Sequence, residues 1–370
     1  MIKRSHLLLA TLLGTFAAAA VAVASVGLPR PGAAKVGPTV PSLAAAHALP
    51  AAPATPPATL RATGLYADGS TTTLAPGVRP FAPQYPLWTD GASKRRWIAL
   101  PPGSAIDATR ADAWQFPVGT QLWKEFSFGR RVETRYMERT ASGWLFATYV
   151  WNDAGTEATL APTAGLASVE VAAGVRHRVP AQADCTICHG GAAPVLGFSA
   201  LQLSTDRDPG APHAEPAPAD ALDLAGLIAG GQLVHFDAAI GAAPRIVARS
   251  PTERAALGYL HGNCGSCHRP GGAADSVGMY LLQSLEPGAT TTQPTTIDVA
   301  SRFRPAGTSD PRRIVAGDPG HSVLLGRMAS RDPVAQMPPF GSQLVDTQAV
   351  ALVSRWIAEL ASLEHPVDRT

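Results

Sequence analysis

Two five-residue motifs constrain this chain more than any other feature of its sequence. Residues 185–189 read CTICH and residues 264–268 read CGSCH, and together they contain all four cysteines of the 370-residue chain. Each motif places two thiols three positions apart and a histidine directly after the second thiol. The fold therefore has to present the same three side chains twice, each time within a few residues of backbone.

Three kinds of chemistry use a Cys-x-x-Cys pair. A structural zinc ion would bind all four cysteines as thiolates, and a dithiol redox site would need one motif on a thioredoxin-like strand–helix unit. Covalent haem c needs two thiols for the porphyrin vinyl groups and the following histidine for the iron. Only haem requires the histidine, so the sequence predicts two haem c groups. Their ligands would be Cys185, Cys188 and His189, and Cys264, Cys267 and His268.

The second haem has a methionine available as its sixth ligand. Met337 lies in the segment QMPPFG, downstream of His268, and the two prolines restrict the backbone of this loop. A methionine thioether at the sixth position is typical of electron-transfer haems. We therefore predict that Met337 binds the second iron, that Met328 packs in the core and that Met279 forms part of the crevice wall.

The first haem has no methionine between His189 and Met279. His213 lies in the proline-bounded segment APHAEP, a setting similar to that of Met337, and is our candidate for its sixth ligand. His235, His261 and Met279 are further candidates, and an open position is an alternative. His261 precedes Cys264 by three residues and is better explained as a hydrogen-bonding group near the second haem.

The N-terminus has the pattern of an export signal. MIKRSH is positively charged, residues 7–24 are apolar, and Ala22-Val23-Ala24 fits a cleavage site. We predict a signal peptide over 1–24 and a Pro/Ala-rich linker over 25–60. An uncleaved segment acting as a membrane anchor is the alternative. Either reading places the body of the protein outside the cytoplasm, in the periplasm of a Gram-negative bacterium.

The rest of the chain changes character near residue 180. Segments rich in Trp, Tyr, Phe and Val predict strands over 94–100, 120–128, 130–140 and 143–151. Ser250 and Asp346 are predicted helix caps, the second before an amphipathic helix over 347–363. We expect an α+β chain: an antiparallel β sandwich or half-barrel over 61–180, then mostly α-helical haem units over 181–249 and 250–370.

Net charge and motifs exclude some functions. The net charge of +2 gives no basic field for nucleic acid. Residues 61–180 contain neither a serine-nucleophile motif nor a Gly-rich phosphate loop.

Longer phrases resemble known proteins. From Ser250 onward, the capped helix, CGSCH, the MPP loop and the closing helix with Trp356 resemble class I cytochrome c. YLHGNCGSCHRPGG, RIVAGDPGHSVLLGRM and PLWTDGASKRRWIALPPG resemble a group of exported bacterial dihaem c-type cytochromes with an N-terminal β domain. The resemblance implies His189 and His268 as proximal ligands and Met337 as a distal ligand. It does not define the distal ligand of the first haem.

These observations favour an electron-transfer protein over an enzyme. Its expected partners are redox proteins of the periplasm or inner membrane. The alternative is a dihaem peroxidase or oxidase whose first haem is an open, reactive site. A third hypothesis makes the β domain a docking module that binds a partner or a polymer.

Overall fold

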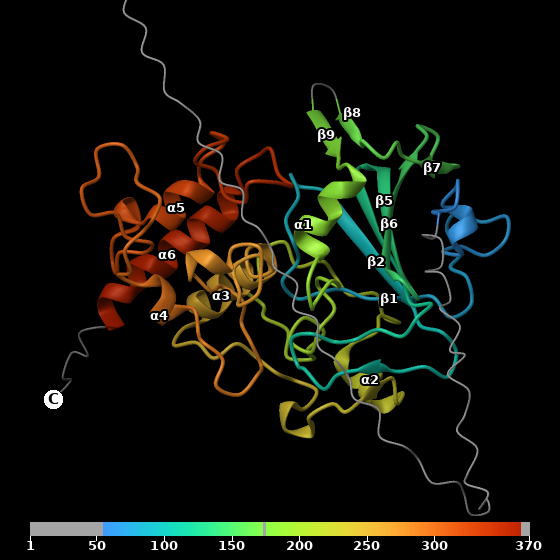
Figure 1. Cartoon of the computed structure of the whole chain (residues 1–370), viewed down its shortest axis with the longest axis horizontal. Helices are drawn as coiled ribbons and strands as arrows, with labels where there is room; N and C mark the ends of the chain where they lie inside the picture. The colour runs from blue at the N-terminus through green and yellow to red at the C-terminus, as the bar shows by residue number, and fades with distance from the viewer. Residues whose placement is uncertain (1–54, 173–174, 364–370) are drawn as a thin grey trace, which may run out of the picture. The chain divides into compact units, whose positions relative to one another are not determined.

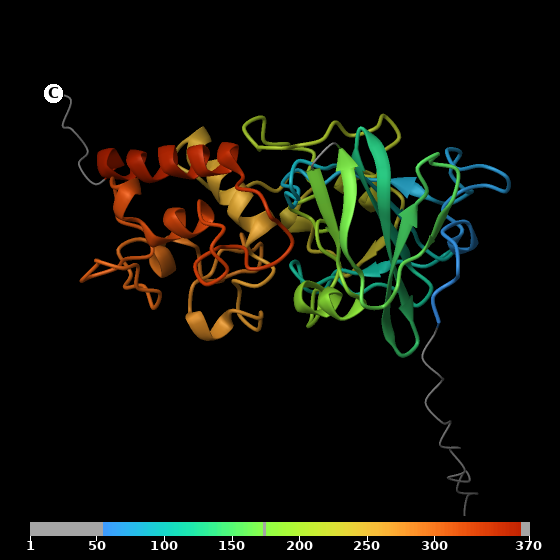
Figure 2. The same ribbon diagram turned by 90° about the horizontal axis from the view of Figure 1, so that it is seen from above.

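The structure, a computed structural model, describes residues 55–172 and 175–363. The predicted signal peptide and most of the predicted linker lie outside the described residues. The described residues belong to one unit, in which the strands gather on one side and the longer helices on the other (Figure 1, Figure 2). Within the described ranges, no helix has both the length and the apolar character needed to cross a membrane.

A six-stranded antiparallel sheet is the largest element of this unit. The strand order is β1-β2-β4-β5-β6-β7. The antiparallel β structure and the four predicted strands are confirmed, with shifts of one residue at both ends of the first strand and at the start of the second. The bounds are β1 (Arg79–Pro80), β2 (Ser93–Ala99), β4 (Gln121–Phe128), β5 (Arg130–Thr140), β6 (Gly143–Trp151) and β7 (Ala158–Leu160).

Two small sheets accompany the large one. β8 (Leu166–Ala172) and β9 (Val175–Val179) pair antiparallel, and β3 (Ile106–Asp107) pairs parallel with β10 (Leu233–Val234). Among the described residues there is no second large sheet, so the sandwich that the sequence suggested is not found. The Pro- and Gly-rich chain around α2 (Leu224–Ala229) packs on the sheet instead, because such a sequence offers few donors for a ladder of hydrogen bonds.

The two faces of the large sheet are covered by different parts of the chain. On one face Trp97, Trp123 and Tyr136 stand in one cross-strand row and pack on the segment around Leu60 and Leu65. Side chains alternate between faces along a strand, so the neighbouring row points the other way. That row, Ile98, Leu122, Met137 and Phe146, packs against Phe198 and the chain that follows it.

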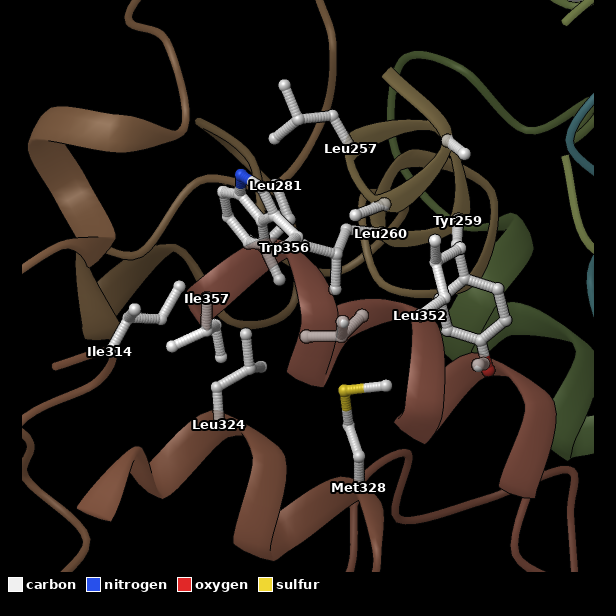
Figure 3. Close-up of a cluster of buried hydrophobic side chains, with 14 of the residues drawn as sticks. Leu257, Tyr259, Leu260, Leu281, Ile314, Leu324, Met328, Leu352, Trp356 and Ile357 are labelled. Carbon is white, nitrogen blue, oxygen red and sulfur yellow. The ribbon is translucent and has the colours of Figure 1, made fainter. Parts of the chain in front are cut away.

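Four α-helices of the described chain lie after Ser250: α3 (Pro251–Asn263), α4 (Gln293–Thr296), α5 (Val323–Met328) and α6 (Thr347–Leu363). Both predicted caps are confirmed: Ser250 Oγ accepts from the Glu253 N–H at 3.0 Å, and Asp346 Oδ1 accepts from the Ala349 N–H at 3.0 Å. Figure 3 shows Trp356 and Ile357 of α6 in an apolar cluster with residues of α3 and α5. The predicted apolar face of α6 is therefore its buried face.

Short helical segments complete the chain. The first Cys-x-x-Cys-His motif is itself a short helix, α1 (Cys185–His189). Single turns of 3-10 helix are η1 (Arg61–Thr63), η2 (Gln182–Asp184), η3 (Ala238–Ile240), η4 (Asp275–Val277) and η5 (Pro319–His321).

Tyr85 joins the sheet side to the helix that carries the second motif. Its side chain is 2% exposed, and its hydroxyl donates to Asp208 at 3.1 Å. A Cβ atom on Gly258 of α3 would lie 2.0 Å from Tyr85 Cε1, and one on Gly262 would lie 2.3 Å from the Tyr85 carbonyl oxygen. The two glycines therefore permit a contact that any larger residue would prevent, and α3 rests directly on the chain after β1.

We predict that Gly258→Ala destabilises the protein although Ala is the better helix former. The added methyl group would overlap the buried Tyr85 ring, so the free energy of unfolding should fall by about 1–3 kcal/mol. Gly326→Ala in α5 is the matched control, because its Cβ would meet nothing within 4 Å, and a gain of about 0.5–1 kcal/mol is expected there. Denaturant unfolding of both variants measures the difference, and equal effects would contradict the packing described.

Candidate functional site

A cavity of about 880 Å³ lies where the sheet side and the helices meet. This volume is near the upper end of the range of about 300–1,000 Å³ usual for small-molecule sites. Both cysteine motifs open onto this one cavity. Of the sequence-predicted site residues, seven line it: Cys185, Cys188, His189, Cys264, Cys267, His268 and Met337.

The first motif places His189 against the sheet. Its ring centroid lies 5.5 Å from that of Phe146 on β6, and its Nδ1 donates to the Pro194 carbonyl oxygen at 2.6 Å. Burial lowers the pKa of His189 to about 4, so the ring is neutral at pH 7. With the proton on Nδ1, the lone pair of the imidazole is on Nε2, which has no hydrogen-bond partner in the described part of the chain.

The second motif repeats this arrangement at the end of α3. The N–H of His268 donates to the Cys264 carbonyl oxygen at 2.9 Å, which closes the motif into a turn. His268 Nδ1 donates to the Met279 carbonyl oxygen at 3.2 Å, and burial lowers the pKa of the ring. Arg313 holds this receiving segment by donating to the carbonyl oxygens of Val277 and Gly278, both at 2.7 Å.

Both histidines therefore have the same hydrogen-bonding arrangement. A metal-binding histidine usually donates its second ring N–H to a carbonyl or carboxylate, which fixes the tautomer and the ring orientation. Here each Nδ1 makes that bond to backbone, and each Nε2 is left for a ligand. Both motifs therefore present the cavity with an imidazole whose other ring nitrogen is bound to backbone.

The cysteines of the two motifs meet inside the cavity. None of the four is disulfide-bonded. Cys188 and Cys267 lie close enough to influence each other's titration, which raises the pKa of Cys188 and lowers that of Cys267. Burial raises the pKa of Cys264 to about 12. In the described ranges, no three side chains among His, Cys, Asp and Glu are grouped to hold a metal ion, as a four-thiolate zinc site would require.

The loop with Met337 is held by α5. The Met337 N–H donates to the Arg327 carbonyl oxygen at 2.9 Å, and Arg327 Nε donates to the Ala335 carbonyl oxygen at 2.8 Å. Met337 thus lines the same cavity as His268. Met279 and Met328 also line it, and Met328 packs in the apolar cluster of Figure 3 as well.

His213 lies one layer behind the cavity. It is not among the lining residues, and its Nε2 donates to both oxygens of Asp346, at 2.8 and 3.0 Å. Asp346 itself lines the cavity and caps α6. His235 is exposed beside Asp107, and Nδ1 of His261 accepts from the Gln283 N–H at 3.1 Å. The structure therefore does not bring His213 to the first motif.

The walls of the cavity carry an excess of positive charge that the sequence did not reveal. Eight Arg or Lys side chains line it against three Asp side chains, whereas the whole chain is nearly balanced, with 30 basic and 28 acidic residues. Strands of the large sheet supply Arg96, Lys124 and Arg135, and the C-terminal part supplies four arginines. No local motif marks these positions, because the strand register decides which face they share.

Comparisons of the chain with protein-family models, with curated proteins and with solved structures found no match.

We predict that Asp346 stabilises the fold in a pH-dependent way. Burial on its own would raise the pKa of Asp346, but hydrogen bonds from His213 and the Ala349 N–H outweigh it and lower the pKa. The stabilisation is therefore complete above the unfolded value of about 3.9 and is lost as the pH falls through the lower folded value. At pH 7, Asp346→Asn should cost about 1–3 kcal/mol, with the deficit disappearing in acid.

Asp346→Ala is the companion variant, because it removes the helix cap as well as the charge. Asparagine caps helices about as well as aspartate, whereas alanine does not. The Ala variant should therefore lose about 1 kcal/mol more than the Asn variant at neutral pH. Chemical unfolding from pH 2 to 7 provides the measurement, and a deficit of Asp346→Asn that persists at pH 2 would rule out the ionic contribution.

Proposed function

We propose that this protein is a dihaem c-type cytochrome that transfers electrons outside the cytoplasm, in the periplasm. One observation carries the proposal: both motifs open onto a single cavity, each with its histidine Nδ1 bound to backbone and its Nε2 left for a ligand. Its partners would be redox proteins of the periplasm or inner membrane.

The residues lining the cavity fit haem. Cys185 and Cys188 would hold one group and Cys264 and Cys267 the other, each thiol adding across a vinyl double bond. A sulfur–carbon bond forms, the thiol hydrogen goes to the neighbouring vinyl carbon, and no electrons are gained or lost. The walls combine apolar side chains such as Phe81, Leu122 and Leu281 with the excess of cations, and a porphyrin carrying carboxylates presents both kinds of surface.

The chain's own side chains would set the properties of each site. Haem, when bound, supplies one-electron chemistry, and the protein supplies ligation, orientation and electrostatics. His189 and His268 would provide the proximal nitrogens, and Met337, held by Arg327, the sulfur ligand of the second site. The order of α3, CGSCH, the Met337 loop and α6 supports a class I cytochrome c-like arrangement after Ser250.

A second candidate function is a dihaem peroxidase or oxidase. It is favoured by the position of His213, which donates to Asp346 and does not line the cavity. The first site would then lack the sixth ligand that the sequence suggested and would be open to a small molecule.

The first test is the mass of the matured protein. Expressed with a haem-attachment system, the wild-type chain should gain the mass of two haems that survive denaturation. The double variant Cys264→Ser/Cys267→Ser should retain one haem and the corresponding Cys185→Ser/Cys188→Ser variant the other. A chain that matures without added mass would refute the proposal.

The second test compares two methionines by spectroscopy. Met337→Leu should abolish the sulfur-to-iron charge-transfer band of the oxidised protein and let carbon monoxide bind to one reduced haem. Met328→Leu, a volume-conserving change at a methionine that lines the same cavity and packs in the apolar cluster, should do neither. Wild-type protein that binds carbon monoxide at one haem would favour the enzyme, and a band that survives Met337→Leu would exclude Met337 as a ligand.

A further inference from the structure

Three cations stand side by side on the cavity face of the large sheet. In the strand register Arg96 of β2 lies opposite Lys124 of β4, and Lys124 lies opposite Arg135 of β5. All three line the cavity. Like charges directly opposite each other destabilise a sheet, so this row, called here the cation row, needs an explanation.

The carboxylates near the cation row do not pair with all three of its cations. Glu215 binds Arg96 Nη1 at 2.5 Å, and Glu133 binds Arg135 Nη2 at 2.6 Å. Nη2 of Arg96 is buried without a hydrogen-bond partner among the described residues, and the Arg96 side chain is only 5% exposed. Lys124 makes no ion pair or hydrogen bond within the described residues; its ammonium group lies 5.0 Å from the centre of the Phe126 ring.

One further cation, Lys94, lies beside the row. Lys94, the next residue on this face of β2, is buried, and within the described chain its Nζ donates to the Ala92 carbonyl oxygen alone. His177 of β9 is buried against Glu133 at 3.0 Å. Burial, together with Arg96, Lys94 and Arg135, holds the pKa of Lys124 well below its usual range. An ammonium ion at this position therefore lacks the counter-charge that a buried cation requires.

The cation row faces the first motif. Phe146, which contacts the His189 ring, is on β6, next in the sheet to β5. Arg135 is paired with Thr148 of β6, which lies two residues from Phe146 and therefore on the same face of the sheet. An anionic group reaching the row would therefore belong to a ligand in the part of the cavity lined by Cys185 and Cys188.

We propose that the cation row of Arg96, Lys124 and Arg135 is an anion-binding site that receives carboxylates of the group attached at Cys185 and Cys188. The site rests on the proposed function, because it takes the propionates of the first haem as its anions. The same chemistry would also bind a free oxyanion, and the experiment below separates the two sources. The sheet would then be one wall of the first cofactor site.

Lys124→Gln in the full-length matured protein tests the site, with Lys124→Arg as the conservative variant. Arg61→Gln is the control for the change of charge, since Arg61 is exposed in η1 and does not line the cavity. In sulfate-free buffer, Lys124→Gln should shift the resonance Raman propionate-bending bands of one haem. Lys124→Arg and Arg61→Gln should leave them in place. Lys124→Met, which also removes the charge and keeps an apolar stem, replaces the Gln variant if that one does not fold.

Added sulfate provides the second readout. If the row binds free oxyanions, sulfate should raise the melting temperature of wild type and Arg61→Gln more than that of Lys124→Gln, with the Raman bands unmoved. A Raman shift without this sulfate effect identifies the propionates as the anions. Unchanged bands together with equal sulfate effects in all variants would overturn the anion site.

The haem count by mass separates this result from the proposed function. If the protein carries two covalent haems but Lys124→Gln changes neither the Raman bands nor the effect of sulfate, the anion site alone is refuted. A chain without haem would refute the proposed function, and the sulfate measurement would still decide whether the row binds anions.

Discussion

The contact between Tyr85 and the two glycines of α3 is the constraint on which the site depends. Gly258 and Gly262 let the helix lie directly on the Tyr85 ring and backbone. Asn263 extends the junction: its Oδ1 accepts from the Trp88 N–H at 2.8 Å, and its Nδ2 donates to the Pro86 carbonyl oxygen at 3.2 Å. The second motif begins at the next residue. The helix end and the chain after β1 are therefore fixed together, and the two motifs open onto one cavity.

This junction bears on the role of the β domain. As an independent docking module, the sheet would need an exposed functional face. Instead, one face packs on the N-terminal segment around Leu60, and the other divides between an apolar row on Phe198 and the cation row. Because the apolar and cationic rows are adjacent on one face, they form a wall that suits an amphipathic ligand. The architecture favours a sheet that helps to build the first site.

The sequence predicted those features that depend on interactions between residues close together in the chain. The strand 130–140 has the residues and turn that specify it, Ser250 and Asp346 cap helices, and the cysteine spacing is contained within one turn. The meeting of Cys188 with Cys267 could not be predicted, because it depends on long-range packing. The cation row depends on register, since a shift of one residue would move Lys124 to the opposite face. His213 resembled Met337 in its proline-bounded setting, but its partner, Asp346, is remote in sequence.

The excess of positive charge has a consequence for folding. Arg96 and Arg135 have carboxylate partners, but Lys124 has none in the described residues. Placing a cation there without a counter-ion costs free energy, and the chain accepts this cost next to the thiols that would fix the ligand. A group that binds only the folded chain stabilises it by mass action, and a covalently attached group cannot dissociate. Carboxylates at the row would offset the repulsion among Arg96, Lys124 and Arg135 in the folded state alone. Attachment and folding would then be coupled through electrostatics as well as through apolar burial.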